Sequence, residues 1–282
     1  MKLIKNNKKI AIFFNSMRGI SVFKKISQKY YTDVYVALKN LNNATRLYLK
    51  KKKISYTLIK KIDSSLIKKI KKKNYDILIS AGFPLIFPNK LIEASSLSTI
   101  NLHAGKLPSY RGGSPLNWQI INGEKEIEIN IIKMEEKIDH GKIYLSKKFK
   151  LLKDGNIKTV HKKTNILFPK MTLQVIEMIY KNIKPVSQKS ESNRRPKTYK
   201  QRSEGDGLIK WNNLSANEVY NFVRAITKPY PGAFYYDKNK NKKRLYSCKL
   251  SSKNPNILPG TEFFMKKKKF IKCKKYSIQL LS

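Results

Sequence analysis

The sequence predicts an α/β fold with a mostly parallel sheet, followed by a smaller β-rich segment at the C-terminus. Two observations lead to this prediction. Between residues 10 and 122, short apolar runs alternate with amphipathic stretches, as in βαβ units. The runs are apolar at almost every position, which is typical of strands buried on both faces of a parallel sheet. After residue 207, one helical stretch is followed by several short β runs.

The first part should contain strands and helices in alternation. The strands are expected at residues 10–15, 33–38, 55–59, 76–80 and 99–103, and the helices at 21–29, 43–52, 64–72, 88–94 and 115–122. Pro88 suits the first turn of its helix, where a proline costs no hydrogen bond. This order predicts helices on both faces of the sheet.

The alternation ends after Gly123. Strand-like runs at 126–135 and 142–151 are joined by a turn that contains Asp139. A long helix is expected at 156–182, and Pro169 should kink it or mark a boundary. Residues 184–203 are polar, charged and contain proline, which is typical of a linker.

These patterns predict a domain at 1–190, a linker at 191–206 and a small C-terminal subdomain at 207–282. The subdomain should open with a helix at 215–227, because Ser215 and Glu218 have the spacing of a capping box. The β runs that follow predict a small OB-like structure. They lie at 232–236, 244–250, 260–264 and 270–281.

The net charge of the 282-residue chain is +43, from 61 basic and 18 acidic residues. One interpretation is a surface for a polyanion such as tRNA, DNA or an anionic membrane. The other is compositional drift, because Lys, Ile and Asn are all common, as an AT-rich genome would produce. The lysines are spread along the chain instead of lining one helix face, which favours drift.

Cys248 and Cys273 are the two cysteines, and their spacing predicts neither a zinc site nor a disulfide framework. No run has the length of a membrane-spanning helix. The apolar run at 10–14 is too short for the core of a signal peptide. A cytoplasmic protein without membrane insertion is therefore expected.

Asn101, His103 and Asp139 are the candidate chemical groups. Asn101 and His103 alternate along one strand, so their side chains point to the same side. They lie at the carboxyl end of that strand, where open α/β sheets place their sites. Alone, a histidine at a strand end is more often structural, and an aspartate in a turn often serves only the turn. The loop after His103 is rich in glycine and proline, which favours a site.

Four short phrases together resemble the 10-formyltetrahydrofolate-dependent formyltransferases. They are Asn-x-His at 101–103, Leu-Pro-x-Tyr-Arg-Gly at 107–112, Pro-Leu-Asn-Trp at 115–118 and Ile-Asp-x-Gly at 138–141. The likeness is strong over residues 75–150 and returns at 224–234. It implies a Rossmann-like formyltransferase domain, with 10-formyltetrahydrofolate as the formyl-donor co-substrate.

The resemblance also implies a mechanism of direct attack. The neutral amine of the acceptor attacks the formyl carbon and a tetrahedral intermediate forms. Asn101 and a protonated His103 would stabilise its oxyanion. Asp139 would pair with His103 and help, through water, to move the proton of the amine. A carboxylate beside an imidazole favours the protonated ring. No metal is expected, since the sequence offers no ligand cluster.

A folate pocket is implied at residues 80–87, although an ordinary loop that feeds the core would have the same composition. The backbone of the Asp139 turn would close this pocket. The residues expected to bind the donor are Phe83, Pro84, Leu85, Ile86, Ile138 and His140. His140 is interpreted as facing solvent in preference to acting as a second titrating group.

Lys106, Tyr110 and Arg111 are expected to line the cleft of the acceptor, where they would meet phosphate groups. Arginine suits bidentate contact with phosphate. Arg111 has a second interpretation of equal weight, in which it ties down its own loop through backbone carbonyls.

The sugar-nucleotide N-formyltransferases are the branch that the phrases resemble best, together with Thr-Lys-Pro-Tyr-Pro-Gly-Ala-Phe at 227–234. This branch implies a nucleotide-linked amino-deoxysugar as acceptor and a product for a surface glycan such as O-antigen or lipopolysaccharide. By analogy it also implies a homodimer.

Two alternatives remain open. The first is methionyl-tRNA formyltransferase, the alternative under which a nucleic-acid partner is expected. Its usual early insertion is missing after residue 38, and its C-terminal domain is larger. The second is a non-catalytic, polycationic RNA-binding module on the same fold, which the net charge of +43 motivates.

Overall fold

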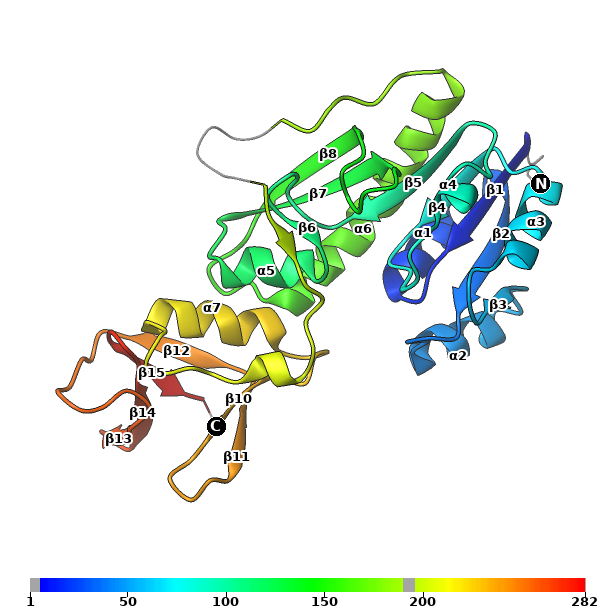
Figure 1. The fold of residues 1–282 in the computed structure, drawn as a ribbon. Helices are drawn as coiled ribbons and strands as arrows, with labels where there is room; N and C mark the ends of the chain where they lie inside the picture. Colours follow the sequence, from blue (N-terminus) through cyan, green and yellow to red (C-terminus); the bar gives the residue numbers. More distant parts are fainter. Residues whose placement is uncertain (1–5, 190–195, 282) are drawn as a thin grey trace. The chain divides into compact units, whose positions relative to one another are not determined.

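The computed structural model describes residues 6–189 and 196–281 (Figure 1). Its chain divides into two compact units, each assembled from separate stretches of sequence. Unit 1 comprises residues 1–111, 128–148 and 162–197, and unit 2 comprises 112–127, 149–161 and 198–282. Of the predicted linker at 191–206, residues 191–195 lie outside the described residues.

A seven-stranded sheet with the order β3-β2-β1-β4-β5-β7-β8 carries the α/β part. Its strands are β1 (Asn6–Phe13), β2 (Tyr30–Ala37), β3 (Thr57–Ile59), β4 (Ile77–Ser80), β5 (Ser98–His103), β7 (Glu126–Lys133) and β8 (Ile143–Lys150). The first five are parallel, and β7 pairs antiparallel with β5, so that His103 lies opposite Asn130. The predicted, mostly parallel sheet is confirmed.

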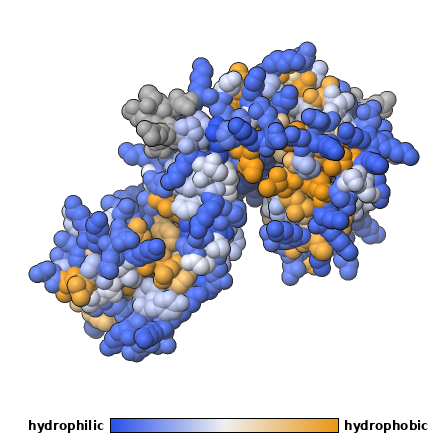
Figure 2. Space-filling model, in the orientation of Figure 1, coloured by the Kyte–Doolittle hydropathy of each residue, from blue (hydrophilic) through white to orange (hydrophobic). Residues whose placement is uncertain are grey.

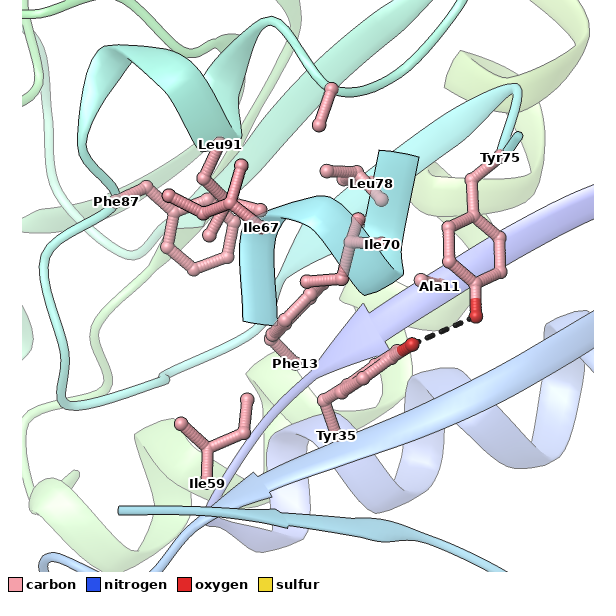
Figure 3. Close-up of a cluster of buried hydrophobic side chains, with 11 residues drawn as sticks. Ala11, Phe13, Tyr35, Ile59, Ile67, Ile70, Tyr75, Leu78, Phe87 and Leu91 are labelled. Carbon is pink, nitrogen blue, oxygen red and sulfur yellow. Dashed lines mark hydrogen bonds between the residues drawn. The ribbon is translucent and has the colours of Figure 1, made fainter. Parts of the chain in front are cut away.

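The apolar half of β1, residues 10–13, is buried on both faces, as its sequence predicts. Ala11 and Phe13 belong to a cluster with Leu91 of α4 (Asn89–Ile92) and with Ile67 and Ile70 of α3 (Ser64–Lys73). Figure 3 shows these side chains converging over the strands. Ile10 and Ile12 alternate with them and are fully buried on the opposite face.

Two tyrosines add polar contacts to this cluster. The ring of Tyr35 stacks on Phe13 with centroids 4.7 Å apart. Its hydroxyl bonds that of Tyr75 at 2.9 Å (Figure 3). The Tyr75 hydroxyl donates to Asp33 at 2.5 Å, so the buried hydroxyls are satisfied. Burial is the main cause that raises the pKa of Tyr75.

The helices between the strands begin and end where local chemistry allows. In α1 (Met17–Ile26), Gly19 passes so close to Phe14 that an added Cβ would lie 2.0 Å from it. Asn42 caps α2 (Asn43–Lys51) and Asp63 caps α3, each through its side chain. α5 (Pro115–Ile121) begins with a proline at its first position.

The helix α6 (Ile157–Tyr180) runs through Pro169 without a break. The interpretation of Pro169 as a boundary is therefore wrong. The proline removes one hydrogen bond, but buried residues on either side, including Phe168 and Met171, hold both halves in place. Among residues 6–189 and 196–281, no helix combines the length and apolar character that a membrane span needs.

The C-terminal part is a small antiparallel β structure with one helix, as predicted. α7 (Ala216–Ile226) has the expected capping box, in which Ser215 and Glu218 bond each other's backbone. One sheet has the order β12-β15-β14-β13, and β10 and β11 form a hairpin. These strands are β10 (Ala233–Tyr236), β11 (Lys242–Leu245), β12 (Cys248–Ser251), β13 (Glu262–Met265), β14 (Lys268–Lys272) and β15 (Ser277–Leu280).

Two of the predicted β runs are each two strands. The run at 244–250 is interrupted at Tyr246 and Ser247, between β11 and β12. The run at 270–281 folds into a hairpin, with Tyr276 in a left-handed backbone conformation at φ +63°. That turn contains no glycine or proline, so the sequence pattern predicts one continuous strand. Cys248 and Cys273 are buried free thiols in this part.

Two short elements complete the fold. Strands β6 (Arg111–Gly112) and β9 (Thr198–Tyr199) pair with each other. A 3₁₀ turn, η1, spans Gly205–Gly207.

Candidate active site

Asn101, His103 and Asp139 come together in unit 1. The Asn101 Nδ2 donates to Asp139 Oδ1 at 3.2 Å. The His103 Nδ1 lies 3.3 Å from Asp139 Oδ2, and the two side chains are 4% and 7% exposed. β5 supplies the first two residues and the turn after β7 supplies the third. The three side chains are therefore in contact; those of His103 and Asp139 are buried and that of Asn101 is partly buried.

Both nitrogens of the His103 ring face groups that can only accept. Nδ1 faces the Asp139 carboxylate, and Nε2 lies 2.7 Å from the backbone oxygen of Tyr110. Both contacts are hydrogen bonds at the same time only when both nitrogens carry protons. The ring is thus held between a carboxylate and a carbonyl.

The turn that carries Asp139 has a constrained backbone. Asp139 adopts φ +57°, in the left-handed region that aspartate tolerates better than most residues. The Lys133 N–H donates to the Lys142 carbonyl at 2.8 Å and closes the base of the turn. A Cβ added to Gly141 would lie 1.7 Å from the Lys133 oxygen. Only glycine fits this position without a shift of the backbone.

Arg111 reaches across to the same turn. Its Nη1 lies 2.8 Å from His140 Nε2, and its Nη2 donates to Gln188 Oε1 at 2.7 Å. Its Nε is buried and finds no acceptor among the described residues. Burial lowers the pKa of Arg111, while the nearby Asp139 carboxylate opposes that shift.

The contact with Arg111 fixes the form of His140. A guanidinium can only donate, so Nε2 of His140 must accept and carries no proton. The other nitrogen, Nδ1, then donates to the Ile138 carbonyl at 2.9 Å. His140 is exposed, as interpreted from the sequence, and it is also a neutral partner of Arg111.

Gln188 belongs to this arrangement although no motif marks it. Its Nε2 donates to the backbone oxygens of Asp139 and Gly141, at 2.8 and 2.9 Å. It lies in the polar stretch that the sequence presents as a linker. A lone glutamine in such a stretch carries no spacing or pattern that could have identified it.

Family models match both parts of the chain. Residues 8–176 match the formyl transferase model, and residues 202–282 match the model of the formyl transferase C-terminal domain. The chain belongs to the formyl transferase family.

Curated relatives include two kinds of protein. The chain is 34% identical over 271 residues to the bifunctional polymyxin resistance protein ArnA of Wigglesworthia glossinidia brevipalpis. The matched region covers 96% of this chain and 36% of that protein. It is 32% identical over 192 residues to the methionyl-tRNA formyltransferase of Thermodesulfovibrio yellowstonii. The matched region covers 68% of this chain and 59% of that protein. The chain thus spans only part of either relative.

Solved structures share the fold. A 4-N formyltransferase from Francisella tularensis superposes with a TM-score of 0.67 at 26% identity, over 84% of this chain and 96% of that one. A sugar N-formyltransferase from Shewanella sp FDAARGOS_354 superposes with a TM-score of 0.68 at 19% identity, over 84% of this chain and 96% of that one. HypX from Aquifex aeolicus in complex with tetrahydrofolic acid superposes with a TM-score of 0.68 at 14% identity, over 98% of this chain and 44% of that one. The last two likenesses show the fold alone.

The residues expected to bind the donor of this formyl transferase are partly core and partly surface. Phe83 packs edge-on against Phe13 at 5.5 Å, and Leu85 is partly buried against the same cluster. Ile86 and Ile138 are 71% and 50% exposed. Pro84 is partly buried. Figure 2 shows hydrophobic side chains gathered on unit 1 in the region of α1, β1 and β4.

The residues expected to meet the acceptor differ in exposure. Lys106 is partly buried, whereas the Tyr110 side chain is 2% exposed and belongs to the core. Tyr110 reaches the site through its backbone, because its N–H donates to the Lys106 carbonyl and its oxygen meets His103.

A buried polar group supports the loop that follows His103. Asn130 is fully buried and donates from Nδ2 to the Gly105 carbonyl at 2.7 Å and to Glu128 at 3.0 Å. The Ser146 hydroxyl donates to its oxygen. The motifs did not point to Asn130, although its place opposite His103 in the sheet makes it a neighbour. Within the described part of the chain, no cluster of three or more His, Cys, Asp or Glu could hold a metal ion.

Proposed function

We propose that this formyl transferase moves a formyl group from 10-formyltetrahydrofolate to the amine of a nucleotide-linked amino-deoxysugar. The observation that carries the proposal is the contact of Asn101, His103 and Asp139, with both His103 nitrogens facing acceptors. Such a group offers hydrogen-bond donors and a positive charge to an oxyanion.

In the proposed reaction the lone pair of the neutral amine attacks the formyl carbon. A C–N bond forms, and the carbonyl π electrons move to oxygen. One N–H of the Asn101 amide is used on Asp139, and the other is assigned to the oxyanion. His103 contributes its charge and shares the Nε2 proton with the Tyr110 carbonyl.

Collapse of the oxyanion breaks the bond between the formyl carbon and the folate nitrogen. The amine must lose a proton in this step, and the folate nitrogen must gain one. Asp139 is proposed to accept the proton of the amine through a water molecule and to return it to the folate nitrogen. Its contacts with Asn101 and His103 hold it in position for this transfer.

The loop after β4 suits a flat, partly apolar donor. Ile86 leaves an apolar side chain exposed on this loop and Ile138 leaves one exposed on the turn of Asp139. Phe83 and Leu85 present partly buried ones. Small-molecule sites are lined in this way, with a few polar groups among apolar ones. The backbone of Ile138 and His140 would complete the donor pocket, and bound 10-formyltetrahydrofolate supplies the electrophilic carbon.

Lys106 is proposed to meet the diphosphate of the acceptor, with Tyr110 holding its loop. Arg111 adds positive charge beside the catalytic turn, but its contacts with His140 and Gln188 already occupy both ends of the guanidinium. We assign it to the acceptor side of the site as an anchor of the turn.

The choice of a sugar acceptor rests on the relatives. The likeness to ArnA extends over 96% of this chain, whereas that to the methionyl-tRNA formyltransferase extends over 68%. The 4-N formyltransferase from Francisella tularensis shares 26% identity. We further propose that the product enters a surface glycan, such as O-antigen or lipopolysaccharide, and that the enzyme works in the cytoplasm as a homodimer.

Methionyl-tRNA formyltransferase is the second candidate function. Several such enzymes are about as similar in sequence, at 30–32% identity, and a net charge of +43 suits a tRNA substrate. A non-catalytic RNA-binding role is weaker, because the catalytic residues are in contact.

The deciding experiment measures tetrahydrofolate release from 10-formyltetrahydrofolate with dTDP-, UDP- and GDP-linked amino sugars, and with methionyl-tRNA in parallel. Turnover with one amino sugar is the expected result. Turnover with methionyl-tRNA alone would replace the proposal by the second candidate. Absence of turnover with every acceptor, together with RNA binding that weakens steeply with salt, would favour the non-catalytic role.

A further inference from the structure

Gln188 uses its side-chain amide on three partners at once. Oε1 accepts from Arg111 Nη2 at 2.7 Å, and Nε2 donates to the Asp139 and Gly141 carbonyls at 2.8 and 2.9 Å. These partners fix the orientation of the amide, because a guanidinium only donates and a backbone carbonyl only accepts. Both N–H groups of Gln188 are therefore committed to the turn that carries Asp139.

We propose that Gln188 is a positioning residue that holds the Asp139 carboxylate against His103 during formyl transfer. This inference rests on the roles proposed above for Asp139 and His103. It goes beyond them by assigning the geometry of the pair to a residue from a distant part of the chain. Gln188 lies 49 residues after Asp139 in sequence.

The backbone of Asp139 shows why the turn needs such support. A residue with a side chain at φ +57° is in a sparsely populated region, and it persists there only when its surroundings enforce it. Gln188 binds the backbone carbonyls of Asp139 and Gly141, the residues immediately before and after His140. It therefore restricts rotation of the backbone that aims the carboxylate.

Arg111 extends the same clamp. It links Gln188 to His140, so the guanidinium and the amide together contact the turn at three successive residues. At the other end of the turn, the tight fit of Gly141 against Lys133 leaves little freedom. The carboxylate between these supports lies 3.3 Å from His103 Nδ1.

A plainer interpretation is that Gln188 only satisfies the partly buried guanidinium of Arg111. Two substitutions separate the two interpretations. Gln188→Ala removes all three contacts. Gln188→Glu keeps an acceptor for Arg111 but replaces both N–H donors by oxygen, which faces two carbonyl oxygens. Positioning of Asp139 predicts that both variants are impaired, whereas satisfying Arg111 predicts that Gln188→Glu works normally.

The kinetic test compares kcat for formyl transfer. We expect both variants to lose about 10- to 100-fold in kcat, since small errors in the placement of catalytic groups have effects of this size. Gln174→Ala, an exposed glutamine of α6, should match the wild type and is the control. In an Asp139→Asn background, adding Gln188→Ala should lower kcat by less than about 2-fold further, because Gln188 acts through Asp139. Wild-type kcat in Gln188→Glu, or the full loss in the Asp139→Asn background, would overturn the proposal.

A second readout needs no acceptor. The chain has three histidines, so their ring ¹⁵N resonances can be assigned by single substitutions. Gln188→Ala should move the His103 Nδ1 resonance toward its position in Asp139→Asn, and Gln174→Ala should leave it in place. An unmoved His103 resonance would overturn the positioning role. A wild-type enzyme without activity on any amino sugar would instead contradict the proposed function, so the two failures are distinguishable.

Discussion

His103 is buried between a carboxylate and a carbonyl, and the proposed mechanism assigns it the positive charge beside the oxyanion. We expect His103→Gln to lower kcat about 100- to 1,000-fold, because an amide has the shape to replace one hydrogen bond but not the positive charge beside the oxyanion. The measurement is tetrahydrofolate release at saturating substrates. His161→Gln, in a helix of unit 2, is the matched control. Equal kcat values for the two variants would remove His103 from the mechanism.

Gly141 provides a second test at the level of single residues. A Cβ at this position would lie 1.7 Å from the Lys133 oxygen, so Gly141→Ala must displace the turn and with it Asp139. We expect a loss of at least about 10-fold in kcat and a lower melting temperature. Gly205→Ala is the control, because the nearest atom to its new Cβ lies 4.0 Å away. If Gly141→Ala were as active and as stable as Gly205→Ala, the turn would have to be far more adaptable than its contacts indicate.

Among the elements, α7 depends on its N-cap, Ser215. Ser215→Ala should lower the free energy of unfolding by about 1 kcal/mol, the usual cost of a lost N-cap. Urea titration is the measurement, with exposed Ser252→Ala as the control.

The same cap carries a pH dependence. Its contacts lower the pKa of Glu218 below the ordinary 4.5, so the folded state binds this proton less readily than the unfolded chain. The stabilisation is therefore complete above pH 4.5 and is lost as the pH falls through the lower, folded value. The difference between the wild type and Ser215→Ala should shrink over that acidic range. A difference that stayed constant would show that the carboxylate does not take part.

Elements with a strong local pattern could be predicted, and those fixed by distant contacts could not. Residues 10–13 of β1 and 77–79 of β4 are apolar, and both strands were placed correctly within a few residues. The hairpin of β14 and β15 was missed because its turn has no glycine or proline. Gln188 was missed for a related reason: its importance lies in contacts with Arg111 and Asp139, which only the folded chain brings together.

The whole molecule carries a charge of +43, which should act on the proposed diphosphate acceptor over long distances. We expect kcat/KM for the nucleotide sugar to fall as salt rises from about 0.05 to 0.5 M, because screening shortens the reach of the charges. The value of kcat should stay nearly constant, since the buried site is screened much less. A flat kcat/KM over this range would support compositional drift as the whole explanation of the charge.

The buried thiols of the C-terminal sheet can report when this part of the protein opens. Burial is the main cause that raises the pKa of both Cys248 and Cys273 to about 12, and the thiolate is the form that reacts with maleimides. The native protein should therefore resist alkylation at neutral pH. Each labelling event would mark a transient opening of the small sheet. Comparing labelling rates with and without nucleotide sugar would then reveal whether acceptor binding tightens this region, with no probe added to the chain.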